Sequence, residues 1–383
     1  MNSCSKLDYI PCDLVTDILS KLPSKSLLRF KTTCKTWYSL ISDTVFINLH
    51  SKQASQNPKI LFSTTGFQIQ ILDYENTSFD DSCLSGPVNV PEKLCASHTE
   101  IIGSSCGLVC VAIYHCRLGC SGTDWLGESN CFGKTFYIWN PSTRECRKIP
   151  NLYMNSNIQY LGMIHGFGYD LVTNDFKLVI STDTFTYNVF SLKANSWKTI
   201  ACPLGSEYYY HCNLESWTSP ATVINGIFHW VVGTHPSNCE ILTLDVANES
   251  FEKLQLPFNL SLQSKSIASL FEHRGFLCVC FSKLGAGSKD EIWMKKEDGG
   301  RMHLLTVKNP FYVFSGMPVL CVSRRNEVVL HNYQEFGRYR REYNKLDEIS
   351  IQTDVYGAVL YVETLVSPNT EDGQQMLSDF SDN

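Results

Sequence analysis

The stretch that decides the fold lies near the start of the chain, where residues 7–50 read LDYIPCDLVTDILSKLPSKSLLRFKTTCKTWYSLISDTVFINLH. Pro11 suits the first turn of a helix, where its missing N–H leaves no hydrogen bond unmade. After it, aliphatic residues recur at helical spacing and form one apolar stripe. The stripe consists of Leu14, Val15, Ile18, Leu19 and Leu22. Pro23 ends this helix, and Ser24 is predicted to cap the next one.

Further short helices are predicted up to His50. The second carries Leu27, Leu28 and Phe30, and the third carries Cys34, Trp37, Tyr38, Leu40 and Ile41. Asp43 is placed to cap a last short turn that holds Val45, Phe46 and Leu49. About forty residues are little chain for burying so much apolar surface. We therefore expect part of that surface to bind a partner, the alternative being a small autonomous helical domain.

This pattern resembles an F-box, and in particular the F-box of plant proteins that also carry an F-box-associated, kelch-like domain. The matching positions are Ile10-Pro11, Leu14, Ile18-Leu19, Leu22-Pro23, Ser26-Leu27-Leu28, Phe30-Lys31, Cys34-Lys35, Trp37, Leu40-Ile41 and Phe46. One departure is Cys12, where the family often has a charged or polar residue. The resemblance implies docking on a Skp-type adaptor, and through it on the cullin of an SCF ubiquitin ligase. The implied adaptor-binding residues are Ile10, Pro11, Leu14, Ile18, Leu22, Pro23, Leu27, Phe30 and Trp37.

Composition excludes several classes of function. The 32 basic and 38 acidic side chains give a net charge of −6, which offers no footprint for a nucleic acid. The sequence shows neither a signal peptide nor an apolar run long enough to span a membrane. We therefore expect a cytoplasmic or nuclear protein with no membrane partner, whose 17 cysteines are mostly reduced core residues.

From Lys59 the pattern changes from helical spacing to short strands rich in β-branched and aromatic residues. A strand that ends in a polar turn, with an apolar residue six positions later opening the next strand, recurs along the chain. The pairs are Asp73 with Phe79, Asn140 with Cys146, Ser191 with Trp197 and Asp245 with Phe251, with weaker copies from Met294 and Asn344. The last five anchors lie about fifty residues apart, a period typical of propeller blades.

A second hairpin precedes each of these, most clearly at Asn225-Gly226. Two hairpins per period make a four-stranded blade, so the sequence predicts a small all-α module followed by an all-β, six-bladed, kelch-like β-propeller. A β-sandwich is the alternative. The predicted boundaries are 7–50 for the F-box, 51–58 for a linker, 59–368 for the propeller and 369–383 for a disordered tail. The run 358–362 has no neighbour of its own and is predicted to complete the blade begun by 59–73, closing the ring.

Recurrent segments of the propeller also look like those of the F-box-associated domain. The segments are 138–144, 165–170, 189–197, 225–226 with 229–230, and 361–368. With the helical match, the resemblance covers most of residues 1–368.

No catalytic constellation is found. Residues 127–135 resemble a phosphate loop, but the spacing of the glycines is wrong and a strand follows in place of a helix. A zinc site would need four ligands from the group Cys106, Cys110, His115, Cys116, Cys120 and Cys131. We interpret these instead as core and loop residues, and predict neither a metal nor a cofactor.

The sequence therefore predicts a non-enzymatic adaptor whose propeller holds a target protein for ubiquitination. Connections between the second and third strands of a blade, and between blades, are long and leave from one face. Their aromatic residues are the predicted target anchors: Trp125, Tyr208, Tyr209, Tyr210, His211 and Trp217. The alternatives are a glycan-binding, lectin-like propeller and a propeller enzyme.

Overall fold

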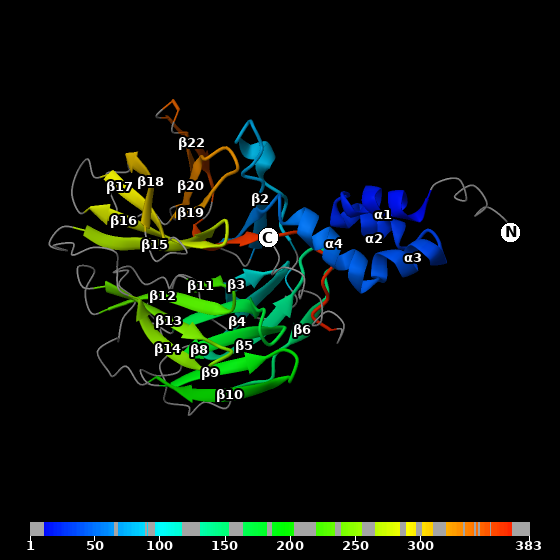
Figure 1. Ribbon diagram of the computed structural model, residues 1–383, viewed down its shortest axis with the longest axis horizontal. Coiled ribbons are helices and arrows are strands. Elements are labelled where there is room, and N and C mark those ends of the chain that lie inside the picture. Colours follow the sequence, from blue (N-terminus) through cyan, green and yellow to red (C-terminus); the bar gives the residue numbers. More distant parts are fainter. Residues whose placement is uncertain are drawn as a thin grey trace.

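A computed structural model describes most of the chain as a small helical module beside a ring of sheets (Figure 1). The described residues are 11–64, 68–88, 90, 96–116, 131–152, 164–181, 186–202, 220–233, 239–254, 265–283, 289–295, 301–308, 319–331, 334–340, 342–343, 345–352 and 354–369.

The helical module consists of α1 (Cys12–Ser20), α2 (Ser24–Phe30), α3 (Lys35–Ser42) and α4 (Thr44–Ala54). Asp43 caps α4 as predicted, because its Oδ1 accepts hydrogen bonds from the N–H groups of Val45 at 2.9 Å and Phe46 at 3.3 Å. The prediction that Ser24 caps α2 is wrong. Pro23 occupies the N-cap position, and the Ser24 hydroxyl donates instead to the carbonyl of Glu363, far along the chain. The predicted linker is also too long, because α4 continues to Ala54.

The remaining chain forms six antiparallel sheets, which are the blades of a propeller. Blade 1 holds β1 (Lys59–Thr64), β2 (Gln68–Leu72) and β23 (Val355–Tyr361); blade 2 holds β3 (Ala96–Ser105), β4 (Leu108–Cys116), β5 (Cys131–Trp139) and β6 (Cys146–Lys148); blade 3 holds β7 (His165–Asp170), β8 (Asp175–Ser181), β9 (Thr186–Ser191) and β10 (Ser196–Ala201). Blade 4 holds β11 (Thr222–Ile224), β12 (Ile227–Gly233), β13 (Cys239–Asp245) and β14 (Ser250–Leu254); blade 5 holds β15 (Lys265–His273), β16 (Phe276–Lys283), β17 (Lys289–Lys295) and β18 (Arg301–Lys308); blade 6 holds β19 (Val319–Val322), β20 (Val328–His331), β21 (Glu335–Arg340) and β22 (Lys345–Ser350).

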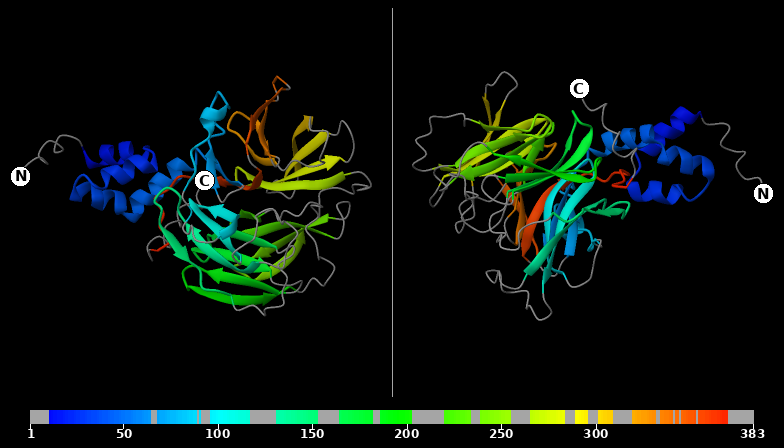
Figure 2. Two further views of the ribbon diagram at one scale, coloured as in Figure 1. Left: turned by 180° about the vertical axis from the view of Figure 1, so that it is seen from behind. Right: turned by 90° about the horizontal axis from the view of Figure 1, so that it is seen from below.

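The first strands of the blades form the inner wall of the ring. β23, β3, β7, β11, β15 and β19 contact one another in that order, and β19 contacts β23 again. This cyclic order confirms the six-bladed architecture and rules out a sandwich, in which no such circuit exists. The two further views show the sheets fanning around one centre while the helices project from one side (Figure 2).

The C-terminal strand closes the ring, as predicted. β23 pairs antiparallel with β1 from Lys59 opposite Tyr361 to Thr64 opposite Val355. The sequence predicted that Phe79 opens an outer strand of blade 1, and the structure does not bear this out. Phe79 lies in the connection after β2, with a φ of 46° and 3% exposure. Among the described residues of this connection, isolated bridges of Ile69 with Val88 and of Leu72 with Leu84 mark the outer edge of the blade.

Tight hairpins join the first two strands of several blades. Asn225 and Gly226, with φ values of 50° and 79°, form the predicted turn between β11 and β12. Two residues with positive φ in succession are what the twist of a two-residue hairpin requires. Cys106-Gly107 and Arg274-Gly275 form the same kind of turn in blades 2 and 5.

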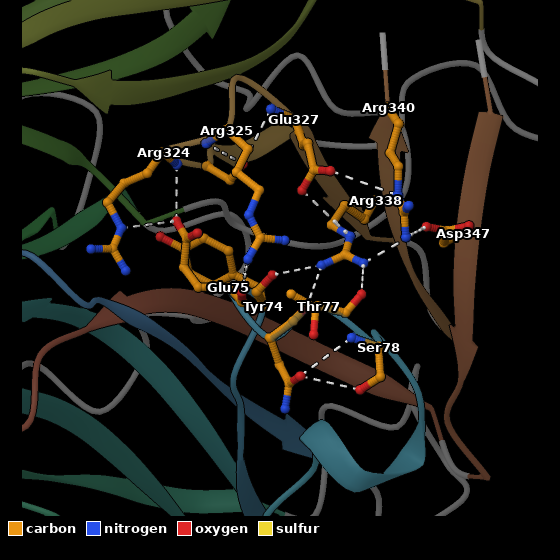
Figure 3. Close-up of polar contacts among 12 residues, drawn as sticks. Tyr74, Glu75, Thr77, Ser78, Arg324, Arg325, Glu327, Arg338, Arg340 and Asp347 are labelled. Atoms are coloured by element: carbon orange, nitrogen blue, oxygen red, sulfur yellow. Dashed lines mark hydrogen bonds and ion pairs between the residues drawn. The ribbon is translucent and has the colours of Figure 1, made fainter. Parts of the chain in front are cut away.

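A buried arginine fastens blade 6 to blade 1 (Figure 3). The side chain of Arg338, on β21, is 0% exposed, and its guanidinium donates to the carbonyls of Tyr74 at 3.3 Å, Asn76 at 2.5 Å and Thr77 at 3.1 Å. The same group lies 4.4 Å from the centre of the Phe79 ring. Three carbonyls of one connection thus converge on one cation, which fixes the path of residues 74–79.

Carboxylates of blade 6 balance the charge of Arg338. Glu327 lies 3.6 Å from Nε and Asp347 lies 3.7 Å from Nη2. Burial lowers the pKa of the guanidinium, and the Glu327 charge counteracts this effect. The arginine therefore links the closing blade to the last blade at the same seam that β23 closes.

Replacing this arginine should destabilise the propeller strongly. Arg338→Met keeps much of the apolar stem but leaves the three carbonyls without their donor, whereas Glu327 and Asp347 keep Arg340 as an ion-pair partner. We therefore expect a loss of roughly 3–5 kcal/mol in the free energy of unfolding, mainly from the unsatisfied carbonyls. Urea denaturation of the full chain measures it. Arg324→Met is the matched control, because the side chain of Arg324 is 57% exposed and its ion pair with Glu75 should contribute less than about 1 kcal/mol. Equal, small losses for both variants would contradict this account.

Candidate functional site

Exposed aliphatic side chains mark one surface of the helical module. Leu14 and Ile18 are 54% and 57% exposed, although they lie one turn apart on the same face of α1. Tyr38 on α3 is 59% exposed. Two apolar residues in succession on one helix face, left uncovered by the chain's own propeller, are typical of a protein-docking surface.

The residues predicted to bind an adaptor differ in their exposure to solvent. Pro11, Leu14, Ile18 and Pro23 are exposed; Leu22, Phe30 and Trp37 are half-buried. Ile10 lies outside the described residues. Phe30 and Trp37 pack edge to face with ring centres 5.0 Å apart, so they join α2 to α3 while part of each ring stays accessible.

Leu27 does not belong to this surface, so the prediction that it contacts an adaptor is wrong. Its side chain is 0% exposed and lies in a buried cluster with Leu19, Ile41 and Phe46. The reason is geometric. The spacing of apolar residues shows that α2 has an apolar face, but a helix of seven residues does not reveal whether that face meets its own core or a partner.

His50 is a structural residue that the sequence analysis missed. Its Nε2 lies 3.0 Å from the carbonyl oxygen of Leu22, which can only accept, so this nitrogen carries the proton. Burial lowers the pKa of His50, and the ring is neutral near pH 7. Its ring also stacks with Phe46, one turn earlier on α4. This contact fixes the end of α1, where Leu22 and Pro23 lie.

The helical module carries a positive charge although the whole chain is negative. Residues 11–58 hold six basic and three acidic side chains, and none of the acidic ones falls between residues 18 and 42. Lys25, Arg29 and Lys35 are exposed, and within the described part of the chain no carboxylate pairs with them. Lys25 and Arg29 share one face of α2, one turn apart. The helical module therefore exposes basic side chains on α2 and α3 as well as apolar ones on α1.

The helical module lies on the face of the propeller where the short turns gather. Cys106 and Leu171, from turns of blades 2 and 3, pack against the cluster that contains Leu19 and Leu27. Strand direction alternates, so the strand ends that flank residues 117–130, 153–163 and 203–219 lie on the opposite face. The predicted target anchors Trp125, Tyr208, Tyr209, Tyr210, His211 and Trp217 lie outside the described residues.

Neither a metal-binding group nor a membrane span is found in the part of the chain that the structure describes. Among those residues no group of three or more histidine, cysteine or acidic side chains converges. Burial raises the pKa of the Cys106 thiol to about 11 and also raises that of the fully buried Cys110, so both are neutral thiols, although Cys106 is only half-buried. None of the described helices is both long and apolar enough to cross a bilayer.

Comparison with known proteins agrees with this architecture. Residues 56–332 match the family described as the F-box associated beta propeller domain, and residues 7–48 match the F-box domain. The chain belongs to the F-box-associated beta-propeller family and carries an N-terminal F-box.

Relatives of similar length occur in Arabidopsis thaliana. An F-box/kelch-repeat protein is 24% identical over 94% of this chain and 96% of its own length. F-box protein CPR1 is 28% identical over 93% of this chain and 88% of its own length. Among solved structures, the SapL1 lectin in complex with alpha methyl fucoside aligns over 78% of this chain and 92% of that chain, with 10% identity and a TM-score of 0.44. A likeness this weak carries no argument about function.

Proposed function

We propose that this chain is the substrate-recognition subunit of an SCF ubiquitin ligase, and that it acts in the cytoplasm or nucleus. The exposed face of α1, with Leu14 and Ile18, carries this proposal, because burying it against a Skp-type adaptor would remove apolar surface from water. The F-box family match supports the same partner.

In this function the chain performs no covalent chemistry. It holds a target protein near a ubiquitin-loaded conjugating enzyme, so that the effective concentration of target lysines rises. The target would bind on the face opposite the helical module, where long connections leave a rigid ring. The aromatic residues of 117–130 and 203–219 are its proposed anchors.

Reconstitution with purified proteins tests this function. The full chain is mixed with a Skp-type adaptor, a cullin–RING pair, the activating and conjugating enzymes, and ubiquitin. We expect a complex of one adaptor per chain. Because no target is present, ubiquitin should be transferred to lysines of the chain itself, which the complex holds near the conjugating enzyme. Failure to bind any Skp-type adaptor of the same plant would overturn the proposal.

The basic side chains of α2 and α3 predict a salt-dependent association. Charge complementarity mainly affects how fast partners meet, so Lys25→Glu, Arg29→Glu and Lys35→Glu together should lower the association rate with the adaptor at least about tenfold at low salt. The difference should shrink at high salt. Stopped-flow measurements at several ionic strengths test this. Changing Lys193, Lys198 and Lys253 of the propeller to glutamate adds the same charge elsewhere and should have a much smaller effect.

A further inference from the structure

The last described residues, 362–369, leave β23 and lie between the propeller and the helical module; we call them the C-terminal strap. In Figure 1 this red segment passes between α4 and β6. The side chain of Asn140, in the turn between β5 and β6, is fully buried and donates through Nδ2 to the carbonyls of Thr364 at 3.0 Å and Val366 at 2.7 Å. Arg147 donates to the carbonyl of Pro368 at 3.4 Å. The strap is thus bound to blade 2 along its length.

The turn between β3 and β4 is shaped to receive the strap. Thr364 donates through Oγ1 to the carbonyl of Cys106 at 3.1 Å. The next residue, Gly107, has a φ of +84°, and a Cβ there would lie only 1.9 Å from the Thr364 hydroxyl oxygen. A glycine at this position therefore serves both the turn and the close approach of the strap.

The other side of the strap contacts the helical module. Ser24, the first residue of α2, donates through Oγ to the carbonyl of Glu363 at 2.9 Å. Glu363 also pairs with Lys59 at 2.9 Å. Leu365 and Val366, at 5% and 1% exposure, lie in the same buried cluster as Leu19, Leu27 and Ile41. The strap thus completes the core of the helices from outside the helical sequence.

The helices have one covalent connection to the propeller, the four residues 55–58 between α4 and β1. At this connection Arg324, from the turn between β19 and β20, donates to the side chain of Asn57. One short connection alone acts as a hinge, and a second attachment removes that freedom. The strap supplies such an attachment in addition to the packing of Cys106 and Leu171 against the helical cluster. It is bound to blade 2 by Asn140 and to the helices by its apolar side chains.

We propose that the C-terminal strap and Asn140 are positioning elements: they fix the orientation of the adaptor-binding helices relative to the propeller. The inference rests on the proposed function, because that orientation determines which lysines reach the conjugating enzyme. A fixed orientation confines ubiquitin transfer to the few lysines in reach, and a hinge spreads it over more.

A single substitution isolates this role. Asn140→Asp keeps the Oδ1 atom that accepts from the N–H groups of Ser142 and Thr143, so the turn keeps its cap. It loses the amide that donates to the strap and places carboxylate oxygens against carbonyl oxygens. Asp245→Asn is the reciprocal control in blade 4, two blades away from the strap, where Asp245 caps the corresponding turn by accepting from the N–H groups of Ala247 and Asn248.

The experiment maps self-ubiquitinated lysines by mass spectrometry in the reconstituted ligase, for the full chain, both variants and a chain that ends at Glu363. We expect Asn140→Asp and the shortened chain to keep adaptor affinity within about threefold of the full chain. The share of ubiquitin on the lysines that the full chain prefers should fall at least twofold. Hydrogen exchange should quicken in α1 to α4 and not in β3 to β5. Asp245→Asn should match the full chain.

The outcomes separate the two proposals. If the full chain binds no adaptor or supports no transfer, the proposed function fails, and this inference fails with it. If it does both and the lysine pattern is the same in every variant, only the positioning role is overturned. A loss of adaptor binding in step with a lower melting temperature would likewise overturn it, because the strap would then serve stability alone.

Discussion

A chain that stops before Val355 should be insoluble, whereas a chain that stops after Asn369 should be soluble and melt cooperatively. β23 supplies the innermost strand of blade 1 and contacts the first strands of blades 2 and 6. Without β23, β1 presents an unpaired edge. Val355, Ala358 and Tyr361 of β23 are buried, with 2%, 8% and 1% exposure, so removing them exposes the side chains that pack against them to water. An exposed apolar edge strand is a template for aggregation, so the loss should exceed the stability of a typical domain, about 5–15 kcal/mol.

The soluble yield of the two truncated proteins and their thermal melting test this prediction. The chain ending at Glu363 is an informative intermediate, because it keeps β23 and lacks most of the strap. We expect it to fold as a closed propeller. A soluble, cooperatively melting protein that ends before Val355 would show that ring closure by the C-terminal strand is dispensable.

Leu14→Asp together with Ile18→Asp should abolish adaptor binding. Burying an aliphatic side chain of this size is worth about 1.5–3 kcal/mol, so losing two of them at the centre of an interface predicts at least a hundredfold weaker affinity. The fold should survive, because both side chains are more than half exposed in the chain alone. Isothermal titration calorimetry with the adaptor measures the effect.

The control for this variant is Val172→Asp. Val172 is 78% exposed in the turn between β7 and β8, on the propeller and outside the proposed docking face of α1. We expect its adaptor affinity to equal that of the unchanged chain. If the two α1 substitutions leave the affinity within threefold while the protein stays folded, the adaptor does not bind this face of α1.

Much of the fold could be predicted because its signals are local. Helical spacing located the first helices, and a capping aspartate at position 43 located the start of α4. The hairpin at Asn225-Gly226 follows from the positive φ values that its turn requires. Even ring closure was predictable, since 358–362 is a strand pattern with no neighbour in sequence, and a lone strand must find its partner elsewhere.

The errors concern contacts between residues distant in sequence. Ser24 is a good capping residue, but it is the first residue of α2 with Pro23 at the N-cap, and its hydroxyl donates to the carbonyl of Glu363. Phe79 matches the period of the blade openings, yet it lies against Arg338, 259 positions away. Leu27 is buried because blades 2 and 3 and the strap share its cluster, which the helix pattern alone does not show. The aromatic residues proposed to bind the target stay predictions, because they lie outside the described residues.

We propose that one chain joins an adaptor to a target through two separate surfaces. The most direct measurement is quantitative mass spectrometry of proteins that co-purify with the full chain and with its Leu14→Asp, Ile18→Asp variant, both expressed in plant cells. We expect the variant to lose the Skp-type adaptor and the cullin and to retain at least one other partner, which accumulates because it is held without being ubiquitinated. Equal recovery of adaptor and cullin by both proteins would contradict it.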